Sequence, residues 1–504
     1  MLSAEELLAA GKAEAYAGRY SDAVTRFDEL LERVGVASDP DTRRLAADAL
    51  SCKADAFRSA GAWEESVRVR DELIARFLGD GDEYLRSVVS VSFDRKARAL
   101  FALGRYDEQL RVRDEELAWY ADGEPEARAF GRVEAMAGRA NALSSLGRKD
   151  EAFAAWGDVL AAVADATEVR ARRLEASAML YRGTRLRVLG KYQAALANLE
   201  RLQGRFAPSE DPHIALRLAQ GLLEQVWVWR QMALPEVAGP ALERLITEFA
   251  SEPDRRIVNL VTRALFIRAE DCYGRGEPEA AEALYDEVLE RARRVADPLV
   301  SECGVSAAVG KAWTAGLRGK FDEGLRHLNE WLQRMTIQFP DDRRHVAELL
   351  YAKMRLLDWA VRVDESVSVA NEIIERFEDS GEPLTRRAVA HALVVKTLGL
   401  AAAGRESESL AAYDAIRERF ADGALEVLDL EISEVHVDAD PWAGRRLAPK
   451  VLLRASILSA LDRDEESANT LDSLIERFAK SDDPAVLAAV EAARQARAHL
   501  ELEE

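Results

Sequence analysis

Apolar and polar positions along the chain follow a helical period that restarts at regular intervals. In residues 41–60, apolar side chains recur at steps of four and three, at Leu50, Ala54 and Phe57, and so define one helical face. Gly61 follows, and after it comes a second amphipathic segment that begins with acidic residues, as helix N-termini favour. The pattern predicts two helices joined at a glycine in the left-handed conformation.

The same pattern recurs along the chain, each time around a glycine or a residue that replaces it, which we call the anchor. The anchors are Gly18, Gly61, Gly104, Gly147, Gly190, Ala233, Gly276, Gly319, Val361, Gly404 and Asp462. Their spacing is 43 residues seven times in succession, then 42, 43 and 58. Chance does not produce seven identical spacings, so the sequence predicts an array of about eleven helix pairs.

Further positions repeat together with the anchors. Five residues after most anchors the side chain is small, as at Ala23 and Ser66, and sixteen residues after seven of them it is aromatic, as at Phe77. A small residue, a glycine and an aromatic residue, carried in one repeat by Ala97, Gly104 and Tyr106, together with the second small residue five positions after most anchors, form a combination that resembles the tetratricopeptide repeat (TPR) family. The usual repeat is ~34 residues long, so this chain resembles a long variant of about 43 residues. HEAT arrays have a closer period, but the signature favours the TPR family.

The resemblance implies an all-α fold, a right-handed α-solenoid of about eleven antiparallel helix pairs with a C-terminal capping helix. We expect a single solenoid over residues 1–504, with repeats in residues 1–480 and the capping helix at about 482–504. The spacing of 58 exceeds the period by 15 residues, which predicts an acidic insertion at about 423–446. Insertions in such arrays map to loops on one face and are sometimes functional. We interpret this one as a neutral insertion, with a functional loop as the alternative.

A basic residue stands eight positions before most anchors, on the core side of the predicted first helix. These bases are Lys53, Lys96, Arg139, Arg182, Arg268, Lys311, Lys353, Lys396 and Arg454. Ten residues after the anchors the second helices carry acids, among them Asp71, Asp114, Asp286, Asp414 and Asp472, with Asn329 and Asn371 as neutral substitutes. A buried charge is costly unless it is paired, so we expect a structural ladder of ion pairs within or between adjacent repeats. The alternative is that the bases line a groove and bind the carboxylates of a ligand.

Large side chains occupy the first-helix positions that line the groove of TPR arrays from the sixth repeat onward, whereas earlier repeats carry polar residues such as Asp55 and Asp94. The large set is Leu223, Trp227, Arg230, Phe266, Tyr273, Trp313, Tyr351, Arg355 and Trp359. Because Trp, Tyr and Arg are enriched at interface hot spots, they predict a partner-binding groove. The alternative is that these rings only pack against neighbouring helices, and the exposure of the three tryptophans distinguishes the two.

Composition narrows the possible partners. The chain has 504 residues, a formal net charge of −21 and three distant cysteines. Acidic excess argues against nucleic acid or an anionic membrane as the main partner, and three cysteines exclude a disulfide framework. No apolar run is long enough to span a membrane, so we expect a cytoplasmic protein. Abundant Ala and Arg with little Lys is typical of a GC-rich bacterial genome.

Residues that suggest chemistry are few. The six histidines, among them His345 and His391, are scattered without metal-ligand spacing, and we interpret them as surface or capping residues. The segment 304–312 resembles a phosphate loop but has one residue too many between its glycines and Ala312 in place of Ser or Thr. We therefore expect no catalytic residues, no metal and no cofactor. An enzyme of the helical-hairpin toroid type needs about six hairpins in a closed ring, which eleven repeats do not fit.

The sequence thus predicts a non-catalytic scaffold or adaptor for protein–protein interaction, with a concave groove that binds a peptide or partner protein. The alternative is a sensor or regulatory subunit of a bacterial signalling or defence system whose effector is a separate chain. The partner, the oligomeric state and the pitch of the superhelix do not follow from the sequence.

Overall fold

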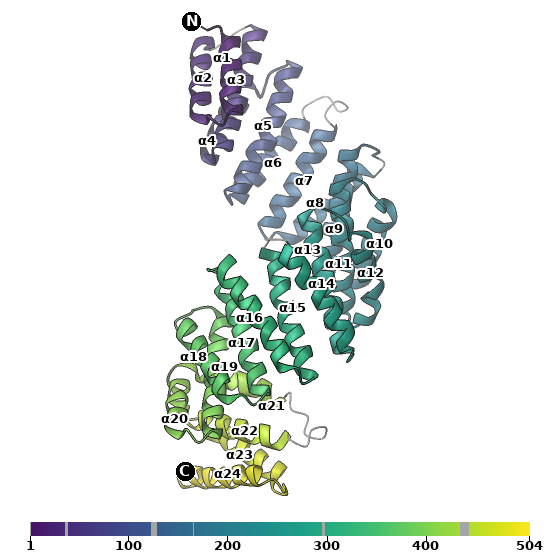
Figure 1. Cartoon of the computed structure of the whole chain (residues 1–504). Helices are drawn as coiled ribbons and strands as arrows, with labels where there is room; N and C mark the ends of the chain where they lie inside the picture. Colours follow the sequence, from purple (N-terminus) through teal and green to yellow (C-terminus); the bar gives the residue numbers. More distant parts are fainter. Residues whose placement is uncertain are drawn as a thin grey trace. The chain divides into compact units, whose positions relative to one another are not determined.

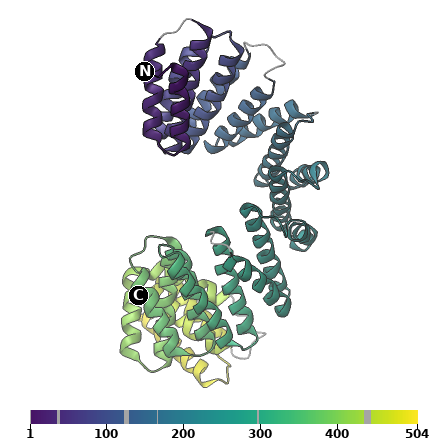
Figure 2. The same ribbon diagram turned by 45° about the horizontal axis from the view of Figure 1, so that its top comes forward.

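The computed structural model describes residues 2–35, 39–121, 129–164, 166–294, 298–433 and 443–503, which form helices and connecting turns without any strand. They gather into two compact units, Met1–Leu260 and Val261–Glu504. Within each unit, consecutive helices lie side by side and roughly antiparallel (Figures 1 and 2). The predicted all-α stack of TPR-type helix pairs is confirmed, whereas the single solenoid over residues 1–504 stays a prediction.

The first unit contains six repeats. Its helices are α1 (Ala4–Tyr16), α2 (Tyr20–Val34), α3 (Pro40–Ser59), α4 (Trp63–Phe77), α5 (Glu83–Ala102), α6 (Tyr106–Ala121), α7 (Ala129–Ser145), α8 (Lys149–Val163), α9 (Val169–Val188), α10 (Tyr192–Phe206), α11 (Pro212–Gln231), the short η1 (Pro235–Ala238) and α12 (Gly239–Glu248). The division between the units falls within α13 (Arg255–Gly274).

The second unit contains the remaining repeats and the predicted terminal helix. Its helices are α14 (Pro278–Arg294), α15 (Pro298–Leu317), α16 (Phe321–Gln338), α17 (Arg343–Trp359), α18 (Val363–Phe377), α19 (Pro383–Ala402), α20 (Glu406–Ala415), the π-helical η2 (Ile416–Phe420), α21 (Ala421–Ser433), α22 (Ala443–Ser459), α23 (Asp464–Phe478) and α24 (Pro484–Glu503). Helix α24 packs against α22 and α23, as expected of a capping helix.

Every anchor has a positive φ, as the pattern predicts. Glycine anchors have φ between 70° and 80°, and the replacements Ala233, Val361 and Asp462 have φ of 57°, 58° and 57°. A side chain at such a φ is strained, most of all a β-branched one. The array therefore imposes the left-handed turn on Val361 against the preference of the residue itself.

The small residue five positions after the anchor allows the two helices of a repeat to approach closely. Where it is serine, its Oγ donates a hydrogen bond to the carbonyl seven residues before the anchor, as Ser66 does to Ala54 over 2.8 Å and Ser467 to Ala455 over 2.9 Å. The aromatic ring sixteen positions after the anchor is buried, as at Phe77, where it closes the end of the hairpin. The buried side chains gather in several clusters along the array, each formed by neighbouring helices.

Bases and acids of the ladder meet between adjacent repeats, from the first helix of one repeat to the second helix of the repeat before it. The separation is 25 residues in Lys53–Asp28 and Lys96–Asp71 (both 2.5 Å), Arg139–Asp114 and Lys311–Asp286 (both 2.6 Å), Arg454–Asp429 (2.5 Å) and Arg497–Asp472 (3.3 Å). In each pair the base is the less exposed partner, as for Lys311 and Asp286, at 7% and 54% exposed. That these pairs fix the stacking register stays a proposal.

Some ladder positions differ from the expected pairing. Asp414 meets Arg417 at 3.5 Å instead of the next repeat, and Asp429 takes its place opposite Arg454. Gly157 stands 25 residues before Arg182, where other repeats carry an acid. Arg182 donates instead to the carbonyl of Phe153. Lys353 and Lys396 stand 24 and 25 residues after Asn329 and Asn371, which carry no charge to pair with them.

The described residues of the predicted insertion, 423–433 and 443–446, are helical and do not form a loop. The second helix of the tenth repeat continues without a break from Glu406 to Ser433, through the π-helical turn η2, and its last part, α21, packs against α19 and α22. Residues 434–442 of the predicted insertion lie outside the described residues. Because Asp429 keeps the 25-residue offset to Arg454, α21 acts toward α22 as the preceding second helix does in other repeats.

Candidate functional site

The predicted groove residues lie on the first helices of four repeats. Leu223, Trp227 and Arg230 lie on α11 in the first unit, and the other six lie on α13, α15 and α17 in the second. Leu223 is only 7% exposed, so its inclusion among the groove residues is corrected, because it packs in the core. Trp227 and Trp313 are half-buried and Trp359 is 39% exposed, so none of these three rings is enclosed by its neighbours.

A cavity of about 870 Å³ in the second unit brings five of the predicted residues together. These are Tyr273, Trp313, Tyr351, Arg355 and Trp359. The opposite side is formed by α19, by Glu431 of α21, and by α22 residues that include Lys450. Phe266 is not part of this lining, and its ring packs against Tyr285 of the same repeat at a centroid distance of 6.2 Å.

The aromatic part of the lining is held in place by packing behind it. The Trp359 ring meets Phe321 edge-to-face, with centroids 5.7 Å apart and an interplanar angle of 76°. The Tyr351 ring meets His391 edge-to-face at 4.9 Å. Such contacts restrict the rings, so the cavity presents ordered, partly exposed aromatic surfaces.

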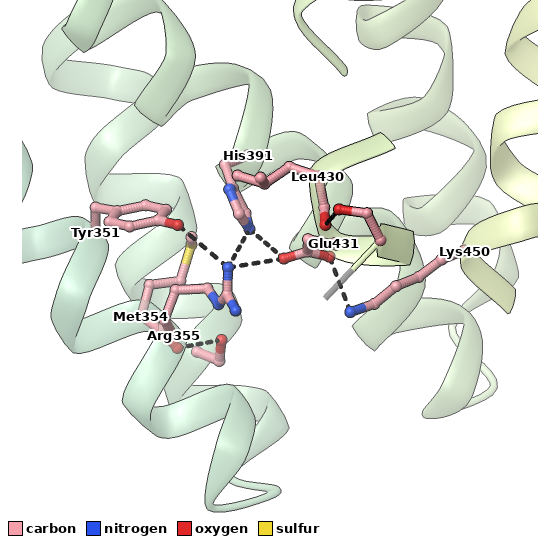
Figure 3. Close-up of polar contacts among 9 residues, drawn as sticks. Tyr351, Met354, Arg355, His391, Leu430, Glu431 and Lys450 are labelled. Atoms are coloured by element: carbon pink, nitrogen blue, oxygen red, sulfur yellow. Dashed lines mark hydrogen bonds and ion pairs between the residues drawn. The ribbon is translucent and has the colours of Figure 1, made fainter. Parts of the chain in front are cut away.

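A cluster of polar groups lies along one side of the cavity (Figure 3). The Glu431 carboxylate is at its centre. Its Oε1 lies 2.8 Å from Nη1 of Arg355 and 2.6 Å from Nε2 of His391, and its Oε2 lies 2.9 Å from Nζ of Lys450. Nη1 of Arg355 also donates to the Tyr351 hydroxyl over 3.1 Å. We call Arg355, His391 and Lys450 the carboxylate-binding triad.

The geometry fixes the proton on His391. A carboxylate oxygen and a bare ring nitrogen cannot lie 2.6 Å apart without a hydrogen between them, so Nε2 of His391 carries a proton and donates to Glu431. Nη1 of Arg355 can only donate hydrogen bonds, and the protonated Nε2 is also a donor. The 3.1 Å separation of these two nitrogens is therefore a contact and not a hydrogen bond. Burial lowers the pKa of His391 more than Glu431 raises it, and the ring is therefore neutral at neutral pH.

Glu431 is ionised in this cluster. It is 5% exposed, and burial alone raises its pKa, but His391, Lys450 and Arg355 outweigh burial and hold the pKa below its ordinary value. A buried carboxylate with three donors is fully compensated. Removing one donor would leave this buried carboxylate with two partners and make its ionised form less favourable.

Tyr351 and Arg355 of this cluster were predictable from the sequence, whereas His391, Glu431 and Lys450 were not. His391 is 3% exposed, so its interpretation as a surface or capping residue was wrong, whereas His345 does lie in a helix cap, on Asp342. Lys450 and Glu431 carried no signal, because Lys450 is off the ladder position and Glu431 lies in the insertion. A count of 33 residues back from Asp462 would have placed Asp429 on the ladder and shown that this segment is helical.

The polar first-helix positions of the first unit are already compensated by buried arginines. Asp55 accepts from the fully buried Arg70 over 2.7 Å. Arg113 joins Asp94 and Glu116, with both distances 2.7 Å. Burial raises the pKa of Glu116 to about 7, more than Arg113 lowers it. These acids serve packing within the first unit.

The described residues offer neither a metal site nor a membrane-spanning helix. They contain no group of three or more His, Cys, Asp or Glu side chains placed to hold a metal ion. None of the helices in the described ranges combines the length and apolar character needed to cross a membrane.

Comparisons with known proteins give likenesses of fold. No family model and no curated protein matches the chain. Among solved structures it is similar to the apo form of the quorum sensor NprR from B. thuringiensis, with 13% identity over 73% of this chain and 96% of that one and a TM-score of 0.44. It is also similar to a tetratricopeptide repeat protein from Parabacteroides merdae, with 16% identity over 60% and 98% and a TM-score of 0.37. At these values the likenesses do not indicate what this chain binds.

Proposed function

We propose that this chain is a non-catalytic protein–protein interaction scaffold that binds a peptide or partner protein in the cavity of its second unit. The observation that carries the proposal is that Tyr273, Trp313, Tyr351, Arg355 and Trp359, from three successive repeats, line one cavity. These residue types bury much area while keeping a polar group available. The volume lies within the range of ligand sites of ~300–1,000 Å³.

The proposal is tested by affinity capture followed by a quantitative comparison. The tagged full-length chain captures a partner from lysate of its native cells, and the partner is then purified. We expect Trp359→Ala and Trp313→Ala each to weaken its binding at least about tenfold, or ~1.4 kcal/mol. Tyr16→Ala is the control, because Tyr16 is 99% exposed and lies in the other unit.

Equal binding by the two tryptophan variants and the Tyr16 variant would contradict the proposal. Circular dichroism of each variant must first show unchanged helicity. Trp359 is 39% exposed and Trp313 is more buried, so truncation of Trp359 disturbs the packing less than truncation of Trp313 does.

The alternative, a regulatory subunit whose effector is a separate chain, is favoured by one feature. Arg355 and Lys450, two cations of the cavity lining, are both ion-paired with Glu431 of the same chain. A binding site with an internal occupant is suited to regulation, because the partner must displace that occupant.

A further inference from the structure

We infer that the carboxylate-binding triad is a site for an acidic side chain of a peptide partner, and that Glu431 occupies it when the partner is absent. The inference rests on the proposed function and specifies the chemistry of the partner. It is carried by the geometry around Glu431, by the charge balance of the cavity and by the origin of α21 in the insertion.

The cavity already demonstrates how it holds a carboxylate. Both oxygens of Glu431 are engaged, one by Arg355 and His391 and the other by Lys450, at 2.6 to 2.9 Å. Arg355 and Lys450 are 26% and 20% exposed and line the cavity. Figure 3 shows one nitrogen of Arg355 making the drawn contacts, and the guanidinium has further N–H groups. A second carboxylate can therefore approach the same cations from the cavity.

The charge balance of the cavity indicates that an incoming carboxylate replaces Glu431 and does not bind beside it. Arg355 and Lys450 contribute two positive charges to the lining, and Glu431 and Asp358 contribute two negative charges. The remaining cation of the lining, Arg445, is ion-paired with Asp483, and His391 is neutral. An additional carboxylate would give the lining a net negative charge, so exchange with Glu431 is favoured over addition beside it.

The exchange requires only the Glu431 side chain to move. Val427 and Leu428 of α21 are buried, at 1% and 0% exposed, and Asp429 pairs with Arg454. These contacts keep the helix on α19 and α22. A tethered carboxylate has an effective concentration in the millimolar range or above, so an isolated carboxylate competes poorly. A peptide gains additional contacts on Trp313 and Trp359 and can compete.

The first test vacates the site and refills it with acetate. In Glu431→Ala we expect acetate to raise the melting temperature of the full chain with saturation, whereas acetamide and chloride at equal ionic strength do not. The control is Glu426→Ala, which removes an exposed carboxylate of the same helix, 68% exposed. No specific effect of acetate in Glu431→Ala would overturn the inference. If that variant does not fold, Glu431→Ser, which also shortens the side chain and vacates the site, takes its place.

The second test uses a peptide probe, acetyl-Glu-Trp-amide, with acetyl-Gln-Trp-amide as its neutral twin. By calorimetry we expect Glu431→Ala to bind the acidic probe at least about tenfold more tightly than the twin, and more tightly than the wild-type chain does. Adding Arg355→Met should abolish the difference between the probes. Equal binding of both probes to Glu431→Ala would overturn the inference, as would wild-type affinity for the acidic probe equal to that of the variant. The proposed function is tested separately, by measuring how tightly Trp359→Ala binds the captured partner.

Discussion

The ladder pair Lys311–Asp286 allows a quantitative test of what a repeated ion pair does in such an array. The Lys311 ammonium is 2.6 Å from Asp286, and the lysine side chain is 7% exposed while the aspartate is 54% exposed. Asp286→Asn leaves the lysine charge in the core without a full counter-charge. Lys311→Met removes that charge, keeps an apolar side chain of similar length and leaves an aspartate that water can solvate.

The expected change in the free energy of unfolding lies between the values known for fully buried and for exposed ion pairs. Breaking a fully buried pair costs about 3–5 kcal/mol, and an exposed pair contributes about 0–1 kcal/mol. With one partner buried and one in water, we expect Asp286→Asn to lower the free energy of unfolding by about 1–2 kcal/mol. Lys311→Met should change it by less than about 0.5 kcal/mol, because the desolvation cost disappears together with the pair.

Urea unfolding of the second-unit transition, followed by helical circular dichroism at neutral pH, measures these values. The double variant should match Lys311→Met within about 0.5 kcal/mol. The array supplies its own control, because Asn371 stands 25 residues before Lys396, the offset at which other repeats carry the paired aspartate, and Asn371→Asp should raise the free energy of unfolding by about 0.5–1 kcal/mol. If Lys311→Met costs more than Asp286→Asn, the lysine stem and not the ion pair stabilises this position, and the reasoning is refuted.

Three further predictions concern other parts of the chain. Asp429→Asn should destabilise the second unit by about 1 kcal/mol and Asp414→Asn by less than about 0.3 kcal/mol, since only Asp429 meets the next repeat; equal urea midpoints would contradict the ladder assignment. Val361→Gly should stabilise the chain by about 1 kcal/mol, because Val361 is 80% exposed and has φ of 58°; a lower melting temperature would show that the turn is not strained. The pKa of Glu116, about 7 in the fold, lies above its ordinary value, so its stabilising contribution is complete below pH 4.5 and is lost as the pH rises through 7. Relative to Glu116→Gln, the wild-type chain should therefore lose up to about 3 kcal/mol between pH 4.5 and 7, and parallel pH profiles would mean that Arg113 keeps Glu116 ionised throughout.

Periodicity predicted the fold better than residue identity did. Val361 is an unfavourable residue for a left-handed turn, and only the spacing marked it as an anchor, yet it has φ of 58°. Because each helix pair repeats the same contacts, one well-determined repeat constrains the others. The ends of the first helices, two or three residues before each anchor, therefore followed from the anchors.

The cavity was predictable only where it obeys the period. Tyr351, Arg355 and Trp359 stand at first-helix positions that line TPR grooves, and the structure places all three in the cavity lining. Glu431 and His391 could not be found in this way, because contacts between the insertion and α19 depend on packing that no spacing encodes. The gap of 58 residues gave the length of the insertion but not its place within the repeat.

Asp429 lies 25 residues before Arg454, the offset that other ladder pairs have. The inserted segment can therefore be deleted without changing that offset. Excision of residues 417–431, fifteen residues that include Asp429 and Glu431, would bring Asp414 to the same offset from that arginine. The array would then stay in phase across the junction while its pocket lost the resident carboxylate. A single insertion or deletion, in evolution or by design, can thus add or remove the Glu431 carboxylate without changes in the repeats on either side.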